Sequence, residues 1–433
     1  MMKTRRFTQL NTRILVVGIS VLLATLLLTA FWGVSASSAS TVETAFVDRD
    51  AGMMSNGSVI TIGVSAATSG GADRIGWRQT NAVQMAVDQI NAGGGVDIGG
   101  TNYTIALVTA DSGCDPTQAI AAANTLFAAG VAAVVGPSCS GASIAVQPDY
   151  AAAGVPIVSG STTAPDVTEQ GYATTFRVIS RDDTPVLMLA DYFRNWLGLE
   201  KVAIVEWAGS WGSFAADAME TTFTGLGGTI TSQRTVTSTA DFASTLATIQ
   251  GEAPDAIFYV DEDANNAGLL SSIADGIGMT DVIIGWSSFT NDRSSLDDYA
   301  NAAGTAAEDD HVGMHYRATE DMPGYTTFNA AYQAAGFANY GDEAQLWGAF
   351  AYDAANIIIA AIDRADSTDP ADIRDEIAAT ANYQGVVGTY EGFDAIGDVI
   401  PQRAWMERYQ SGQWVMLSPS QIFLPIALRN FGP

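Results

Sequence analysis

The stretch that decides the fold is VAAVVGPSCSGASIAVQPDYAAAGVPIVSGS, residues 131–161. It opens with a short apolar run, continues through a small polar turn into the segment ASIAVQPDYAAAG (142–154), and closes with a second apolar run. Short apolar runs bounded by turn residues are typical of buried strands, whereas the longer segment between them has the length of a helix. The stretch therefore predicts a strand, a helix and a second strand, which is the repeating unit of an α/β sheet.

The same alternation extends along the chain in both directions. VITIGVSA (59–66) and TIALVTAD (104–111) have the composition of buried strands, and a helix-like segment follows each of them. The pattern restarts at KVAIVEWA (201–208) and continues through AIFYVDE (256–262) and DVIIGWS (281–287). Strands that alternate with helices form parallel sheets with helices on both faces. The sequence thus predicts an α/β protein with two doubly wound, Rossmann-like lobes.

Length and composition agree with an acidic globular protein of two lobes. The chain has 433 residues, which is more than one hydrophobic core usually organises. It contains 48% hydrophobic and 15% charged residues, as an ordinary globular fold does. The formal net charge of −28 repels the phosphates of nucleic acids and anionic lipids, so we expect no nucleic-acid partner.

The first 36 residues have the layout of an export signal. The basic segment MMKTRRFTQLNTR is followed by an apolar run from Ile14 to Trp32, and VSA at 34–36 resembles a cleavage site. Because the apolar run is also long enough to span a bilayer, an uncleaved N-terminal anchor is the alternative. In both cases we expect an exported protein, periplasmic or at the cell surface, in which residues 37–58 form a polar linker. Its two cysteines, Cys114 and Cys139, most simply form one disulfide in an oxidising compartment.

Three strand ends are unusually rich in small polar residues, at 136–141, 159–165 and 208–212. Ligands of open α/β sheets bind beyond the carboxyl ends of the strands. The first of these turns leads into a helix, whose free N–H groups and dipole would, with the Ser140 hydroxyl, bind a carboxylate. A serine that only caps the helix is the alternative. Two polar turns at neighbouring strand ends favour a binding site.

Several motifs in the first half of the chain carry a family resemblance: Ala86-Val87-Asp88-Gln89-Ile90-Asn91, Asp111-Ser112-Gly113-Cys114-Asp115-Pro116, Gly136-Pro137-Ser138-Cys139-Ser140 and Thr163-Ala164-Pro165. Through them the chain resembles the leucine/isoleucine/valine-binding protein family, the type I periplasmic solute-binding proteins of branched-chain amino acid ABC importers. The likeness covers about residues 59–417. The spacing of the cysteines also matches the disulfide of that family.

The resemblance implies the type I periplasmic binding protein fold, in which the chain crosses three times between the lobes. We expect these hinge crossings near 178–184, 311–318 and 387–392. The expected division is 59–180 with 315–388 for lobe 1, 181–314 with 389–418 for lobe 2, and 419–433 for a C-terminal tail.

The resemblance also assigns ligand-binding roles in the first lobe. Ser140 and Thr163 fall where the family binds the α-carboxylate of the ligand. Ser161 falls where a backbone carbonyl accepts a hydrogen bond from the α-ammonium group. Ser138 and Ile75 fall at positions that line the pocket for the ligand's side chain in this family.

The second lobe departs from the family pattern. Trp211 falls on the aromatic residue that covers the ligand, but Ser287 stands where an acidic partner of the ammonium group is usual. We expect Glu262, which follows a predicted strand, to supply the missing charge, with Asp261 or Asp263 as alternatives. A buried ammonium group without such a partner would be costly.

These features predict a solute-binding protein of an ABC importer, which captures a small amino acid, branched-chain or related, and delivers it to membrane permease subunits. We expect no enzymatic activity and no cofactor. The only histidines, His311 and His315, lie in a strand-like stretch without a neighbouring glutamate, so we expect no metal site. The alternative function is a ligand-sensing ectodomain of the same fold, tethered by an uncleaved N-terminal helix.

Overall fold

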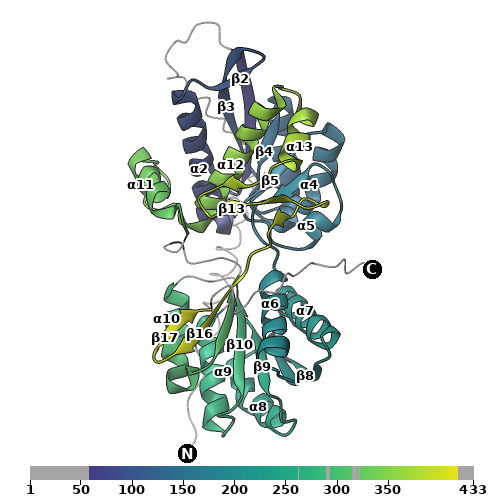
Figure 1. Ribbon diagram of the computed structural model, residues 1–433, viewed down its shortest axis with the longest axis vertical. Coiled ribbons are helices and arrows are strands. Elements are labelled where there is room, and N and C mark those ends of the chain that lie inside the picture. Colours follow the sequence, from purple (N-terminus) through teal and green to yellow (C-terminus); the bar gives the residue numbers. More distant parts are fainter. Residues whose placement is uncertain (1–57, 262, 289–292, 315–318, 320–321, 418–433) are drawn as a thin grey trace, which may run out of the picture. The chain divides into compact units, whose positions relative to one another are not determined.

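The computed structural model describes residues 58–261, 263–288, 293–314, 319 and 322–417 (Figure 1). The described residues form two large sheets, each with hydrophobic cores on its two faces, and two short ribbons of two strands each. We refer to each large sheet with its helices as a lobe. The signal region, the linker up to residue 57, Glu262, His315 and the tail at 419–433 lie outside the described residues.

The sheet of the first lobe has six strands in the order β2–β3–β1–β4–β5–β6. All neighbours are parallel except β2, which pairs antiparallel with β3. The bounds are β1 Ser58–Ala66, β2 Val96–Ile98, β3 Thr101–Asp111, β4 Ala133–Val135, β5 Ile157–Ser159 and β6 Thr175–Arg177.

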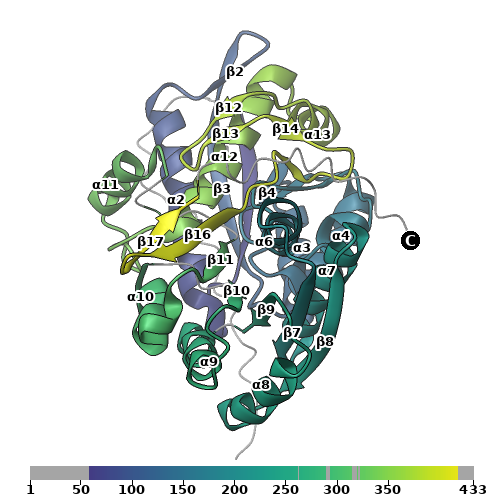
Figure 2. The same cartoon turned by 60° about the horizontal axis from the view of Figure 1, so that its bottom comes forward.

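Helices cover both faces of this sheet, with α2 and α12 on one face and α3 and α4 on the other (Figure 2). Among the described helices, only α12 is long and apolar enough to cross a membrane, but it is two-thirds buried, as befits a core helix. The bounds are α2 Asp73–Ala92, α3 Pro116–Ala128, α4 Ser140–Ala153, α5 Asp166–Glu169, α11 Tyr325–Ala335, α12 Gln345–Ala365 and α13 Pro370–Ala378. The ribbons β12–β13 (Tyr383–Gln384, Thr389–Tyr390) and β14–β15 (Gly392–Phe393, Val399–Ile400) contribute Tyr390 and Val399 to the same core as α12.

The sheet of the second lobe has seven strands in the order β17–β16–β11–β10–β9–β7–β8. The strands from β11 to β8 are parallel, and the hairpin β16–β17 adds an antiparallel edge. The bounds are β7 Lys201–Trp207, β8 Thr229–Val236, β9 Ala256–Val260, β10 Ile283–Ser288, β11 His311–Met314, β16 Trp405–Gln410 and β17 Gln413–Met416.

The helices of the second lobe also cover both faces of their sheet. Helices α8, α9 and α10 build one core, and α6 and α7 build the other. The bounds are α6 Thr184–Asp191, continued by a π-helical turn at Tyr192–Trp196, α7 Ser210–Gly225, α8 Phe242–Gln250, α9 Ala264–Gly276 and α10 Arg293–Ala303.

The predicted α/β architecture with two doubly wound lobes is therefore confirmed. Within 131–161 the structure has β4, α4 and β5, and α4 begins at Ser140, two positions before the predicted 142–154 segment. The predicted closing hairpin is also present. Its turn residues Ser411 and Gly412 both have positive φ, which matches the right-handed twist of the flanking strands.

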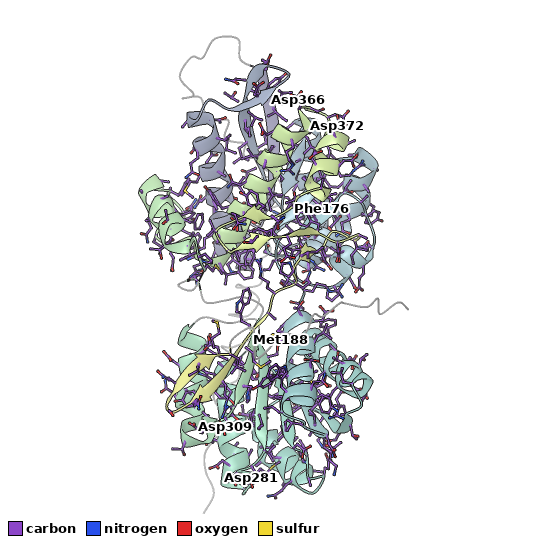
Figure 3. All side chains as sticks on the ribbon, viewed as in Figure 1. Phe176, Met188, Asp281, Asp309, Asp366 and Asp372 are labelled. Carbon is purple, nitrogen blue, oxygen red and sulfur yellow. A yellow bond between two sulfur atoms is a disulfide. The ribbon has the colours of Figure 1, made fainter. Side chains whose placement is uncertain are left out.

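The acidic surface that composition predicts is visible on both lobes (Figure 3). Four exposed aspartates are labelled in that view: Asp281, Asp309, Asp366 and Asp372. The labelled Phe176 and Met188 are buried. Spreading like charges over the surface keeps such a protein soluble.

A buried carboxyl group joins several elements of the second lobe. Asp310, just before β11, accepts hydrogen bonds from the Ser271 hydroxyl (2.6 Å), the Tyr299 hydroxyl (2.8 Å) and the Ile284 N–H (3.0 Å). Burial raises the pKa of Asp310 to about 7, and the three donors only partly oppose this shift. The neighbouring His311 packs against the rings of Tyr192 and Phe193, and burial lowers its pKa to about 4.

Replacing Asp310 with asparagine should remove one source of pH dependence from the stability. A pKa that is higher in the folded than in the unfolded state stabilises the fold below about pH 4, and this stabilisation is lost as the pH rises to about 7. Asp310→Asn stays neutral, so its unfolding free energy relative to wild type should rise between pH 4 and 7. Urea denaturation of both proteins across this range measures the difference, in which the contribution of His311 cancels. A difference that does not change with pH would contradict the expectation.

Candidate functional site

The polar turns of the first lobe meet at the carboxyl ends of β4 and β5. We call residues 136–141 the Ser140 turn and residues 159–165 the Thr163 turn. Because β4 and β5 are neighbours in the sheet, the two turns lie side by side. They are also bonded directly, since the Ala164 N–H donates to the Ser140 hydroxyl at 3.3 Å. The structure thus brings together Ser138, Ser140, Ser161 and Thr163.

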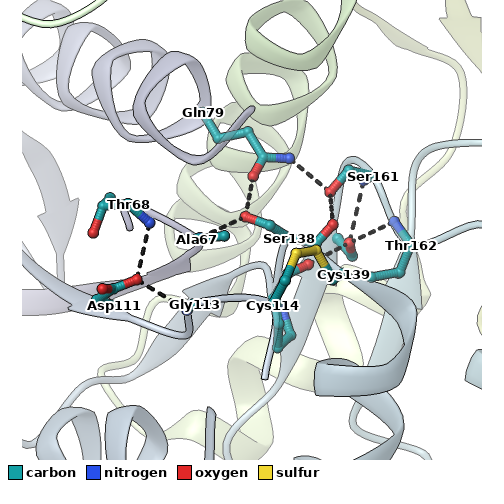
Figure 4. The surroundings of a disulfide bond; sticks show 12 residues. Ala67, Thr68, Gln79, Asp111, Gly113, Cys114, Ser138, Cys139, Ser161 and Thr162 are labelled. Carbon is teal, nitrogen blue, oxygen red and sulfur yellow. Dashed lines mark hydrogen bonds between the residues drawn. A yellow bond between two sulfur atoms is a disulfide. The ribbon is translucent and has the colours of Figure 1, made fainter. Parts of the chain in front are cut away.

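A buried glutamine that sequence analysis did not identify holds the two turns in place. The Ser138 hydroxyl donates to Gln79 Oε1 at 2.5 Å, and Gln79 Nε2 donates to the Ser161 hydroxyl at 2.7 Å (Figure 4). The Ser161 hydroxyl donates to the Ser138 carbonyl at 2.6 Å, and the Ala67 N–H donates to Ser138 Oγ at 3.0 Å. These hydroxyls are therefore occupied within the protein. The sequence offered one signal for Gln79. It lies four positions after the predicted pocket residue Ile75, and hence on the same face of α2, where Ile75 is half-buried.

The predicted disulfide between Cys114 and Cys139 is present, with a Cα–Cα distance of 5.3 Å (Figure 4). It joins the turn after β3 to the residue that precedes α4. On the side of β3, the Asp111 carboxylate accepts from the N–H groups of Thr68 and Gly113, both at 2.9 Å. The Ser140 turn is consequently anchored covalently to a turn that is itself hydrogen-bonded.

A glycine is required where β4 enters the Ser140 turn. Gly136 has a φ of +112°, and a Cβ atom there would lie 2.1 Å from the carbonyl oxygen of Ser65 in β1. Any other residue would force the two strand ends apart. The close approach of β1 and β4 therefore depends on the missing side chain.

Several hydrogen-bond donors of these turns have no partner among the described residues. The Thr163 N–H makes no hydrogen bond with a described residue, and Cys139 gives α4 no side-chain cap. The Thr163 hydroxyl likewise has no described partner, and the Ser140 hydroxyl, which accepts from Ala164, keeps its own proton for donation. Together with the free N–H groups at the N-terminus of α4, these are the kinds of donor that bind anionic groups in proteins.

Two of the residues predicted in the second lobe, Ser287 and Trp211, lie at the carboxyl edge of its sheet. Ser287 lies in β10 and is fully buried, and its hydroxyl has no hydrogen-bond partner among the described residues. Trp211 lies in the first turn of α7, and Glu262 lies outside the described residues.

The two alternative acids beside Glu262 are already engaged. The buried Asp261 accepts from the Tyr259 hydroxyl and from Asn266 Nδ2, each at 2.8 Å. Burial and the charge of Asp261 raise the pKa of Tyr259, so this hydroxyl stays protonated as a donor. Asp263 caps α9 by accepting from the Asn265 N–H at 2.8 Å. Both carboxylates have structural roles within the lobe.

Residues 59–410 match the family model described as periplasmic binding protein. The chain belongs to this family. The Leu/Ile/Val-binding protein BraC3 of Rhizobium johnstonii is 29% identical over 82% of this periplasmic binding protein and 93% of its own length. A Leu/Ile/Val-binding protein homolog of Brucella melitensis is also 29% identical, over 72% of this chain and 80% of its own length.

Solved structures agree with this assignment. One of them is LivJ of Streptococcus pneumoniae, a branched-chain amino acid transporter substrate-binding protein in complex with isoleucine. It is 26% identical to this periplasmic binding protein and has a TM-score of 0.59. The match covers 83% of this protein and 100% of LivJ. A substrate-binding protein of Desulfitobacterium hafniense in complex with Leu is 26% identical and has a TM-score of 0.63. The match covers 83% of this chain and 99% of that chain. The predicted family and the type I periplasmic binding protein fold are confirmed.

Removing the disulfide should destabilise the protein without unfolding it. The two cysteines are 25 positions apart, and a cross-link that closes a loop of this size stabilises by about 3 kcal/mol. The variant Cys114→Ala/Cys139→Ala should therefore denature at a lower urea concentration than oxidised wild type. Wild type in a reducing agent serves as the control and should behave like the variant. Equal midpoints for the oxidised and the cysteine-free protein would contradict this expectation.

Proposed function

We propose that the protein captures a small amino acid, branched-chain or related, outside the cytoplasm and delivers it to the permease subunits of an ABC importer. The single observation that carries this proposal is the set of unused donors at the Ser140 and Thr163 turns. The relatives named for leucine, isoleucine and valine support the same class of ligand for this chain. The family is one of exported periplasmic proteins, which agrees with the basic and apolar N-terminal segment.

The donors of the first lobe suit the α-carboxylate of an amino acid. Hydrogen bonds to a carboxylate are charge-assisted, and the dipole of α4 adds to the attraction. The Ser140 and Thr163 turns contain no His, Asp or Glu that could act as a general base. This composition supports binding without chemical conversion, so we propose no enzymatic activity.

The ammonium group would be held from both lobes. No described N–H donates to the Ser161 carbonyl, which leaves this oxygen as an acceptor at the Thr163 turn. In the second lobe, Ser287 offers a buried hydroxyl and Trp211 is proposed to cover the ligand. Since Asp261 and Asp263 already serve their own lobe, Glu262 is our candidate for the charged partner. Ser138 and Ile75 are proposed to line the side-chain pocket through their apolar atoms.

Closure around the ligand would be a hinge motion of the two lobes about three crossings. We place the first two near 178–184 and 311–318, as the sequence predicts. We place the third at 401–404 instead of 387–392, because Tyr390 and Val399 belong to the core of the first lobe while β16 starts at Trp405. Lobe 1 then comprises 59–180 and 315–400, and lobe 2 comprises 181–314 and 405–417.

The relatives do not favour the alternative of a tethered sensor ectodomain, since they are substrate-binding proteins. Mass spectrometry of the exported protein separates the two possibilities for the N-terminus. A mature chain that starts near Ser37 rules out a tether through residues 14–32. An intact first segment would instead support a membrane-anchored form.

Removing the Thr163 hydroxyl should weaken carboxylate binding. A hydrogen bond to a charged group contributes about 1.5–3 kcal/mol, so Thr163→Val should bind L-leucine about tenfold or more weakly. Thr162→Val is the matched control, since its hydroxyl is buried and has no described partner, and its affinity should not change. Isothermal titration with L-leucine and L-leucinamide measures both effects. Equal affinities of wild type for the acid and the amide would exclude the carboxylate assignment.

Neutralising Glu262 should weaken the binding of α-amino acids. Glu262→Gln leaves an ammonium group without its charged partner, which costs about 2–5 kcal/mol for a buried pair. Binding of 4-methylpentanoate, which lacks the amine of leucine, should change little. Asp263→Asn is the control for a neighbouring acid. If Glu262→Gln binds L-leucine as tightly as wild type, another group holds the ammonium.

A further inference from the structure

We propose that Arg177 is a positioning residue that aims the Thr163 N–H at the ligand's carboxylate and ties the Thr163 turn to the third crossing. This inference rests on the proposed function, because it takes the Thr163 turn as the carboxylate site. Arg177 is the last residue of β6 and is fully buried. Its side chain does not contribute to any of the donors described above.

The guanidinium of Arg177 holds the peptide group that precedes Thr163 and the one that follows Ala164. Its Nη1 donates to the carbonyl oxygen of Thr162 at 3.2 Å and to that of Ala164 at 2.8 Å. In a trans peptide the carbonyl of one residue and the N–H of the next point in opposite directions. A Thr162 carbonyl held towards the buried arginine therefore directs the Thr163 N–H away from it.

The other backbone polar groups of residues 162–164 are also used, so among them the Thr163 N–H is the one left over. The Thr163 carbonyl accepts from the Asp182 N–H at 2.9 Å, and the Ala164 N–H donates to Ser140 Oγ. The Thr162 N–H donates to the Ser159 hydroxyl at 3.1 Å. The backbone of residues 162–164 is thus held by hydrogen bonds at every polar group except the Thr163 N–H. A donor held in this way loses little freedom when an anion binds to it.

The other end of the guanidinium connects the turn to the segment before β16. Arg177 Nε donates to Asp398 Oδ1 at 2.5 Å, and Nη2 donates to the Thr168 hydroxyl at 2.6 Å. Asp398 is almost completely buried, and its second oxygen lies 3.5 Å from Arg181 Nη1. The Arg177 N–H also donates to the Gly397 carbonyl at 3.0 Å. One ion pair therefore links the carboxylate site with the residues that precede the first and third crossings.

The buried positive charge has a second effect on the same site. It lies one peptide group away from the Thr163 N–H, in surroundings that water does not reach. Asp398 binds the Nε side of the guanidinium, whereas Nη1 faces the peptide group before Thr163, so the ion pair has its positive end towards the site. A pair oriented in this way favours an anionic ligand group over a neutral one of the same shape. Arg177 should therefore increase the preference of the site for an acid over its amide, which a purely structural role would not do.

The test compares the affinities of L-leucine and L-leucinamide in the full-length exported protein. Removing Arg177 alone would leave the buried Asp398 without its closest charged partner, so the main variant is Arg177→Met/Asp398→Asn. Its ratio of acid to amide affinity should fall about tenfold relative to wild type, with the amide changing little. Thr168→Ala is the matched control. It removes one partner of the guanidinium without touching the Thr162 and Ala164 carbonyls, so its ratio should stay that of wild type.

A folded double variant with an unchanged ratio would overturn the role of Arg177, while the carboxylate site would stand. Near-ultraviolet circular dichroism establishes whether the double variant is folded. If it does not fold, Arg177→Lys decides the question, because lysine keeps the charge and loses the forked geometry. Its ratio should fall about threefold or more, and an unchanged ratio would overturn the proposal. A wild type without any preference for the acid would instead refute the proposed carboxylate site itself.

Discussion

The arrangement of the candidate site depends on one buried side-chain amide. Gln79 extends from α2 and bonds to both Ser138 and Ser161, which belong to turns after different strands. An amide can donate and accept at once, so a single residue accepts the proton of the Ser138 hydroxyl and donates to the Ser161 hydroxyl. Leaving such groups unpaired is costly in free energy. Helix α2 and the turns after β4 and β5 therefore favour the one arrangement in which all of these hydrogen bonds form. The disulfide also fixes the Ser140 turn, by joining it to the turn after β3, and Gly136 allows the close approach of this turn to β1.

The strands, the order of the helices and the polar turns are predictable because they follow from local patterns. A buried strand needs only a few consecutive apolar residues, and the turn after β4 is recognisable from Gly136 to Gly141. The disulfide was equally accessible, since the chain contains one pair of cysteines. These features establish which turns share an edge of the sheet and point to Ser140, whereas the expected role of Thr163 comes from the family resemblance.

The residues that support the site were not predictable in the same way. Gln79 is 59 and 82 positions from its partners, and Arg177 is 221 positions from Asp398. No periodicity marks a polar residue whose partner is so distant in sequence. The residue type alone also does not reveal whether an arginine is buried or exposed. The place that we propose for the third crossing likewise rests on contacts that are distant in sequence. Tyr390 lies in a short ribbon without a clear strand pattern, and its position is set by burial and by its hydrogen bond to Asp353.

The order of the elements along the chain has a consequence for biogenesis. The core of the first lobe needs α12 and α13, and the sheet of the second lobe needs the hairpin at Trp405–Met416. Neither lobe can close before nearly the whole chain is available, and pairing over such sequence distances is slow. A nascent chain of this design therefore lacks its complete cores until synthesis is almost finished. Such a delay suits an exported protein, because translocation then competes with a slow folding step.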